Sequence, residues 1–225
     1  VDASLGGKTA VNLRFAKNAI GAFYQPRGVF ADVGAIASLP TRELKSGWGE
    51  ALKYACLEPA LLPKAAALAR SGRLDEAFVQ RCMELKIGVV ERDPRERGER
   101  KLLNLGHTFG HAVEAAGGFK RYTHGEAVAS RLAFAFRLAA QLGRIDASAV
   151  ATVERAIRTA GLPTRVPRAV VTRARGLLGY DKKRAPSGLR WVLPRRDGAS
   201  WTVEWDVDGE GLALEGALRE IGEGS

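Results

Sequence analysis

The histidines of this chain gather in one short stretch of the sequence. All three lie between positions 107 and 124, as His107, His111 and His124. Imidazole binds transition metals and exchanges protons near neutral pH, so this stretch is the first candidate for chemistry. Two histidines four residues apart either share one metal ion or divide the work between a metal ligand and an acid or base.

A polar stripe leads into the histidines. Arg100, Asn104, His107 and His111 follow the spacing i, i+4, i+7, i+11, which in a helix over 97–116 places all four on one face. Such a stripe makes a poor core, because each buried polar group would need a partner. The spacing favours the wall of a polar cleft, with an exposed helix face as the alternative.

Two further residues fit a metal site. Thr123 and Glu126 form a T-x-x-E capping box, which predicts that His124 begins a helix; a histidine on a surface loop is the alternative. Glu50 and Lys53 are i, i+3 neighbours, a spacing typical of a surface ion pair. One Glu and two His with an open position are, however, the ligand set of a catalytic zinc. Lys53 would then face the substrate.

The elements that must position these residues are mostly helices. Hydrophobic periodicity and turn residues predict helices from Thr41 and at about 59–71, 74–92, 97–116, 125–143, 147–160, 167–178 and 209–221, and strands at 28–33, 189–194 and 201–205. The expected organisation is the end of an α/β unit over 1–40, followed by a mostly helical domain over 41–225.

Composition narrows the classes of function. The chain has 225 residues, a formal net charge of +10 and no apolar run as long as a membrane span. The basic residues are spread along the chain without an RNP-like motif or zinc-finger spacing, which favours a small anionic ligand over nucleic acid or a membrane. Cys56 and Cys82 are isolated, so we expect reduced, buried thiols in a cytoplasmic protein.

The amino end carries a glycine motif. Gly6-Gly7-Lys8-Thr9 lacks the earlier glycine of a phosphate loop, so it predicts a tight turn that presents a lysine. The chain begins at Val1, without Met and close to this motif, which predicts that it is the middle of a longer protein.

Taken together, these segments resemble the 3-dehydroquinate synthase family. The segments that carry the resemblance are, in chain order, Asp2–Thr9, Gly21–Pro26, Leu39–Glu43, Gly49–Tyr54, Leu102–His111, His124–Val128 and Asp181–Lys183. The resemblance implies a dehydroquinate synthase-like or iron-alcohol-dehydrogenase-like fold, with an α/β remnant followed by a mostly α-helical domain.

The resemblance also implies roles for individual residues. Zinc, with cobalt as an alternative, would be held by Glu50, His107 and His124. Catalytic roles would fall to His111, which would handle a proton at the phosphate-bearing end, and to Lys53 and Asn104. The substrate-binding positions would be Asp2, Lys8, Asn18, Lys53, Lys86, Arg100, Asn104, His111 and one of Lys182 and Lys183. Positions near NAD would be Lys8, Lys17, Ala35, Ile36, Ala37 and Ser38.

The implied reaction converts 3-deoxy-arabino-heptulosonate 7-phosphate, a small anionic sugar-acid phosphate, into 3-dehydroquinate and phosphate, with NAD oxidising the C5 hydroxyl transiently at a zinc site. A homodimer is expected by resemblance. The family's glycine-rich nucleotide-binding half has no counterpart in this sequence, which predicts a fragment or a subunit that works with a separate amino-terminal NAD-binding partner.

The sequence also departs from the family at several positions, among them Leu13-Arg14 and Ser130-Arg131. We expect these departures to alter details of the pocket and to spare the zinc ligands. Two alternatives stay open: a related sugar-phosphate cyclase or polyol dehydrogenase, and a non-catalytic basic binding domain. Lys86, Arg100, Asn104 and His111 together favour an acid-and-phosphate substrate over a neutral polyol.

Overall fold

The computed structural model describes residues 1–11, 13, 20–116, 122–184, 190–208 and 211–223. The α-helices in this part are α1 (Thr41–Leu57), α2 (Leu62–Ser71), α3 (Glu76–Arg92), α4 (His107–Ala116), α5 (His124–Gln141), α6 (Ala147–Thr159), α7 (Arg168–Arg184) and α8 (Leu212–Ile221). Short 3-10 helices are η1 (Val33–Ser38), η2 (Pro59–Leu61) and η3 (Glu99–Asn104). The strands are β1 (Lys8–Val11), β2 (Ile20–Phe23), β3 (Val166–Pro167), β4 (Arg190–Asp197), β5 (Ser200–Asp208) and β6 (Gly222–Glu223).

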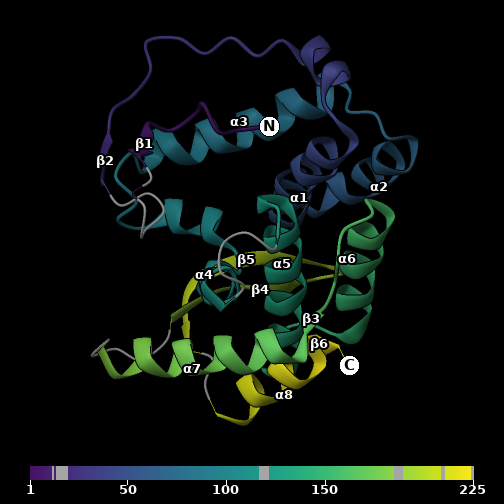
Figure 1. Ribbon diagram of the computed structural model, residues 1–225. Helices are drawn as coiled ribbons and strands as arrows, with labels where there is room; N and C mark the ends of the chain where they lie inside the picture. Colours follow the sequence, from purple (N-terminus) through teal and green to yellow (C-terminus); the bar gives the residue numbers. More distant parts are fainter. Residues whose placement is uncertain (12, 14–19, 117–121, 185–189, 209–210, 224–225) are drawn as a thin grey trace.

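Helix α5 is the centre of the fold. Nearly every residue from Gly125 to Ala139 is buried, because α1, α4, α6, α8 and strand β4 all pack against this helix (Figure 1). A helix that is apolar around most of its circumference is stable only when it is covered on all sides. Phe134 stacks on Phe109 of α4, with ring centroids 3.9 Å apart, and Phe136 meets the edge of Trp201 in β5.

The strands pair into three small sheets of two strands each. β1 and β2 form an antiparallel hairpin, as do β4 and β5, whereas β3 and β6 pair in parallel. The inward residues Trp191 and Leu193 of β4 are buried against α5 and complete the core. The β4–β5 hairpin thereby packs against α5 in addition to the four helices.

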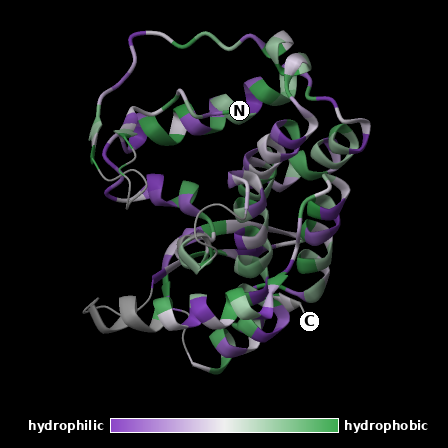
Figure 2. Ribbon diagram, in the orientation of Figure 1, coloured by the Kyte–Doolittle hydropathy of each residue, from purple (hydrophilic) through white to green (hydrophobic). Residues whose placement is uncertain are grey.

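The amino-terminal region is built differently. Between β2 and α1 the chain arcs around the outside of the molecule, at the top of Figure 1, and includes residues coloured as hydrophobic in Figure 2. Phe30 is fully exposed, and Ile20, Phe23 and Tyr24 are each more than half exposed. This region therefore contributes little to the hydrophobic core.

The structure confirms most of the helices expected from periodicity, corrects one predicted strand and adds a hairpin that was not predicted. The strand expected at 28–33 is wrong: the segment is mostly exposed, pairs with no strand among the described residues, and runs into η1 at Val33. The β1–β2 hairpin was missed because its residues are exposed on both faces and show no apolar alternation. Cys56 and Cys82 are buried and free, as expected. No helix in the described part of the chain is both long and apolar enough to cross a membrane.

Candidate metal and substrate site

Two glycines bring helices α1 and α5 into close contact. A Cβ atom on Gly49 would collide with the backbone of Gly125, and a Cβ on Gly125 would collide with the backbone of Ser46. The Gly125 amide donates to Ser46 Oγ at 3.0 Å. The capping box of Thr123 and Glu126 is present and begins α5 at this point, as the sequence predicted. The crossing places the residues next to both glycines side by side.

Those neighbours are Glu50 on α1 and His124 on α5. His124 Nε2 lies 2.9 Å from Glu50 Oε1, and Lys53 Nζ lies 2.6 Å from Glu50 Oε2. Burial alone would raise the pKa of the Glu50 carboxyl, but Lys53, the hydrogen bond from His124 and the charge of Arg131 hold that pKa well below its usual range. Glu50 is therefore a carboxylate at neutral pH, the form that accepts a cation.

His107 enters the site at the start of α4. Gly106 separates η3 from α4; its φ of 72° is one that glycine adopts readily, and a Cβ there would collide with the backbone of Arg131 in α5. This close approach sets His107 beside α5, where its Nε2 lies 3.3 Å from Arg131 Nη1. Arg131 Nη2 in turn lies 3.5 Å from Glu50 Oε1. The guanidinium of Arg131 thus stands between His107 and Glu50.

A second cluster gathers around Asp2. Tyr54 donates from its hydroxyl to Asp2 Oδ2 at 2.5 Å, and Lys86 Nζ lies 3.1 Å from the same oxygen. Burial would raise the pKa of the Asp2 carboxyl, but Lys53, Lys86 and the Tyr54 hydrogen bond lower it below its ordinary value. Burial also lowers the pKa of the Lys86 ammonium. The cluster is a compact arrangement of opposite charges next to Glu50.

Cationic and amide groups from η3 complete the polar wall. Arg100 is 1% exposed; it donates to the carbonyl of Gly6 at 2.5 Å and to that of Pro94 at 2.7 Å. Asn104 Nδ2 donates to Glu96 Oε1 at 2.5 Å, and Lys8 forms an ion pair with the same carboxylate.

Most of these groups line one open cavity of about 600 Å³. The cavity is lined, among others, by Asp2, Lys8, Glu50, Lys53, Lys86, Arg100, Asn104, His107 and His124. A second cavity of about 920 Å³ shares Lys8, Asn104 and His107 with the first and adds the basic residues Arg95, Lys101 and Arg190. The arrangement offers metal-ligating donors beside a concentration of positive charge, which suits a small polyanion.

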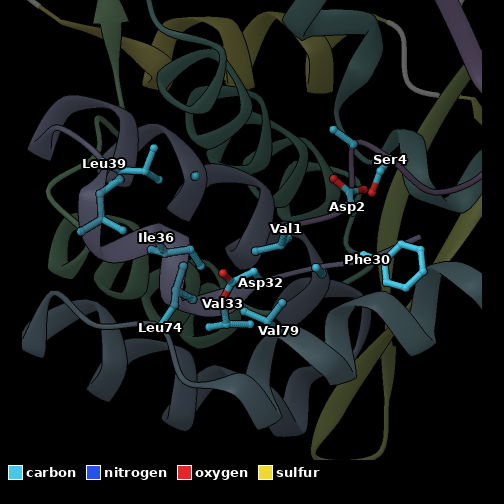
Figure 3. A pocket seen from close by; sticks show the side chains of 14 residues that line it. Val1, Asp2, Ser4, Phe30, Asp32, Val33, Ile36, Leu39, Leu74 and Val79 are labelled. Atoms are coloured by element: carbon cyan, nitrogen blue, oxygen red, sulfur yellow. The ribbon is translucent and has the colours of Figure 1, made fainter. Parts of the chain in front are cut away.

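An apolar cavity of about 340 Å³ adjoins the polar one, because Val1, Asp2, Ala3, Leu39 and Gly47 line both. Figure 3 shows its aliphatic side chains: Val33, Ile36 and Leu39 from the η1 segment, together with Leu74 and Val79. A flat, partly apolar group could enter here and reach the polar cavity at Asp2.

The comparisons with known proteins identify the family. A family model for the 3-dehydroquinate synthase C-terminal domain matches residues 47–184, and one for the 3-dehydroquinate synthase N-terminal domain matches residues 1–46. The chain belongs to the 3-dehydroquinate synthase family. It is 42% identical, over 96% of its length, to the 3-dehydroquinate synthase of Xanthomonas campestris pv. campestris (strain 8004). Against that of Neisseria meningitidis serogroup C (strain 053442) it is 39% identical over 91%. The chain spans 61% and 58% of the length of these relatives, respectively.

Solved structures show the same fold. The 2-epi-5-epi-valiolone synthase ValA from Streptomyces hygroscopicus subsp. jinggangensis 5008, solved with NAD+ and Zn²⁺ bound, superposes with a TM-score of 0.80 at 27% identity, over 98% of this chain and 62% of that one. A 2-deoxy-scyllo-inosose synthase solved with carbaglucose-6-phosphate, NAD+ and Co²⁺ superposes with a TM-score of 0.72 at 24% identity, over 98% of this chain and 64% of that one, and shows the fold alone. The dehydroquinate synthase-like fold expected from the sequence is thus present.

In this member of the 3-dehydroquinate synthase family, residues of the predicted polar stripe lie at the site, but they do not lie on the single helix that was predicted. A single helix over 97–116 was expected, but Gly106 breaks it into η3 and α4. Arg100, Asn104 and His107 still line one cavity, because the bend keeps them on the same wall.

Several expected site residues are placed only in part. His111 lies in α4, and Lys182 and Lys183 lie in α7, but their side chains are outside the described part of the structure. Lys17 and Asn18 lie outside the described residues altogether. Of the four positions Ala35 to Ser38, Ile36 lines the apolar cavity.

Three residues at the site were given no role from the sequence. Tyr54 holds Asp2, and Glu96 joins Lys8 to Asn104 from a left-handed backbone position with φ of 57°. Arg131 was noticed only as a departure expected to alter details of the pocket and to spare the zinc ligands. In the structure its guanidinium contacts both His107 and Glu50. Its position seven residues after His124, two turns along the same helix face, was the available signal.

Proposed function

We propose that the chain is the metal- and substrate-binding part of a 3-dehydroquinate synthase, which converts 3-deoxy-arabino-heptulosonate 7-phosphate into 3-dehydroquinate and phosphate. The observation that carries the proposal is the polar cavity of about 600 Å³, which combines Glu50, His107 and His124 with the cations Lys53, Lys86 and Arg100. A sugar-acid phosphate bears a carboxylate, a phosphate and hydroxyls, and each of these groups finds chemically suited partners there.

The donor set fits zinc, with cobalt as an alternative. Glu50, His107 and His124 would hold the metal, since one carboxylate and two imidazoles with an open position are typical ligands of catalytic zinc. A bound metal would supply Lewis acidity toward the substrate's oxygens. Within the described residues, no three ligating side chains lie close enough together to hold an ion as they stand. Glu50 and His124 already meet, and His107 is separated from them by the Arg131 guanidinium.

The cations of the cavity would orient the substrate. Lys8, Lys53, Lys86, Arg100 and Asn104 would bind its carboxylate, phosphate and hydroxyls, together with Asn18 and one of Lys182 and Lys183. Asp2 keeps Lys53 and Lys86 close together through ion pairs of 3.8 and 3.1 Å, so both ammonium groups are held at the cavity wall. The Asp2 carboxylate itself would accept a hydrogen bond from a substrate hydroxyl.

Proton handling would fall to residues beside the bound substrate. His111, Lys53 and Asn104 would act at the reacting atoms, with His111 at the phosphate-bearing end. The Lys53 ammonium is 2.6 Å from Glu50 and is buried, so a substrate oxygen at Glu50 would also lie within reach of a proton donor.

NAD+ would be bound next to this cavity and would supply a hydride acceptor. Lys8, Lys17 and Ala35–Ser38 are the expected contacts, and the apolar cavity beside Asp2 supports this placement through Ile36. We also propose a homodimer in the cytoplasm. The matched relatives are longer than this chain, which supports the further proposal of a separate amino-terminal NAD-binding part.

The test is phosphate release from 3-deoxy-arabino-heptulosonate 7-phosphate by the purified chain, with zinc and NAD+ supplied, alongside calorimetric binding of the same compound. We expect binding that requires zinc and weakens at least tenfold in Lys86→Met. Phosphate release would show that the chain forms a usable NAD site by itself, whereas binding without release would assign that site to a separate part.

The alternatives predict other results. A polyol dehydrogenase would reduce NAD+ with a neutral polyol and would bind that polyol as tightly as the acid phosphate. A non-catalytic domain would bind neither compound in a zinc-dependent way. Either result would contradict the proposed function.

A further inference from the structure

Arg131 lies where the three proposed metal ligands converge. Its Nη1 is 3.3 Å from His107 Nε2, and its Nη2 is 3.5 Å from Glu50 Oε1, the same oxygen that lies 2.9 Å from His124 Nε2. The guanidinium thus contacts two of the ligands directly and shares a carboxylate oxygen with the third. A metal ion bound by this set would need the same ligand lone pairs.

The fold holds the side chain in this place. Arg131 is 5% exposed, and its stem passes over Gly110 of α4, where a Cβ atom would lie 2.8 Å from Arg131 Cδ. Its backbone also packs against Gly106. Because Gly106 and Gly110 have no side chains, Arg131 fits between α4 and α5, and its guanidinium lies against both His107 and Glu50. Packing therefore fixes the Arg131 side chain at the site.

A guanidinium in this position has the chemical properties of a competitor for the metal ion. A guanidinium stays protonated at any pH a protein tolerates, and it offers hydrogen-bond donors without an acceptor. The guanidinium neutralises the charge of the Glu50 carboxylate as a metal ion would, and it repels a divalent ion brought within a few ångströms. We propose that Arg131 acts as an internal cation that competes with the divalent metal for Glu50 and His107. Metal binding then requires the guanidinium to withdraw from both ligands.

This inference rests on the proposed function, since it takes Glu50, His107 and His124 as the ligand set. The opposite role is equally concrete: Arg131 could orient the ligands and so support metal binding. The two roles predict opposite signs for the effect of removing the guanidinium, which makes the sign of the change the decisive observation.

The experiment is a titration of the metal-free chain with Co²⁺, followed by visible absorption and by calorimetry. Arg131→Met keeps the aliphatic stem over Gly110 and removes the charge. We expect Arg131→Met to bind Co²⁺ at least tenfold more tightly than the unaltered chain. Arg137→Met is the matched control: Arg137 is equally buried on α5, but it bonds Glu154 and the carbonyl of Glu220 away from the site, so its loss should leave the Co²⁺ affinity within twofold. Circular dichroism confirms that each variant is folded.

A second measurement separates the effect of the Arg131 charge on Co²⁺ binding from the effect of the shape of its side chain. In Arg131→Ala, free guanidinium ion at millimolar concentration should enter the space left by the side chain and weaken Co²⁺ binding, and matched sodium chloride should not. The unaltered chain, in which the Arg131 side chain fills this space, should show no such difference between the two salts.

Equal or weaker Co²⁺ affinity in Arg131→Met, with Co²⁺ bound by the unaltered chain, would overturn the competition and leave the ligand set intact. If neither protein bound Co²⁺, the ligand set and with it the proposed function would be overturned instead. The two failures are thus distinguishable.

Discussion

The amino-terminal 40 residues and the helical remainder are stabilised by different kinds of interaction. Helix α5 is buried along almost its whole length, whereas the segment from β1 to η1 leaves Phe30 and Tyr24 largely exposed. The amino-terminal segment is tied to the helices by polar contacts through Asp2, Gly6 and Lys8, and Leu5 is one of its few buried apolar side chains. Each of these polar contacts is made with a residue that either lines the polar cavity or lies beside a residue that lines it. Apolar burial therefore stabilises the scaffold, and the site itself joins the two regions.

The largest effect is expected from breaking the scaffold. Phe134 is fully buried, stacks on Phe109 and lies 5.5 Å from the Trp191 ring. Phe134→Ala removes this packing and leaves a cavity, so we expect the free energy of unfolding to fall by about 3–5 kcal/mol in urea denaturation. A loss below about 1 kcal/mol would contradict the central role of α5.

The second largest effect is expected where α1 and α5 cross. Gly125→Ala places a methyl group on the Ser46 backbone, so the helices must separate, at a cost of about 1–3 kcal/mol. The separation also moves Glu50 away from His124, so metal affinity should fall together with stability. Gly176→Ala is the control: it lies in α7 with no atom near the added methyl, and it should stabilise the chain by about 0.5–1 kcal/mol. An unchanged metal affinity in Gly125→Ala would show that the glycine contact does not position the ligands.

The polar attachment of the amino-terminal segment is weaker. Tyr54→Phe removes the hydrogen bond to the Asp2 carboxylate, which is worth about 2 kcal/mol. We expect faster proteolysis and hydrogen exchange in residues 1–40, with smaller changes in α5. Phe30→Ser, at a fully exposed position of the same region, should change stability by less than about 0.5 kcal/mol. Equal protection of residues 1–40 in Tyr54→Phe and in the unaltered chain would contradict the polar attachment.

The same attachment should depend on pH. The pKa of Asp2 is lower in the folded chain than its ordinary value of 3.8. The stability that Asp2 contributes is therefore fully present above that value and is lost as the pH falls below it, through the folded-state pKa. Asp2→Asn should flatten the dependence of stability on pH in this acidic range. Identical acid denaturation profiles for Asp2→Asn and the unaltered chain would show that Asp2 is not stabilised as described.

The sequence predicted the scaffold better than the contacts within the site. Long periodic segments such as α5 were predictable, since Thr123 and Glu126 mark its start and its buried face repeats. The break at Gly106 was not, because an isolated glycine inside a periodic segment does not reveal a left-handed backbone. The exposed β1–β2 hairpin had no hydrophobic pattern to reveal it. The reach of Arg131 depends on Gly110 in another helix, a tertiary relation that spacing along one segment cannot show.

The most direct test of the central claim is the zinc content of ligand variants after equilibration with excess zinc and removal of free metal. Glu50→Ala, His107→Ala and His124→Ala should each retain no stoichiometric zinc, because each removes one of the three proposed ligands. His111→Ala, which alters a neighbouring histidine of the same helix, should retain one zinc per chain. A full zinc complement in His107→Ala would contradict the ligand set, and with it the proposed site.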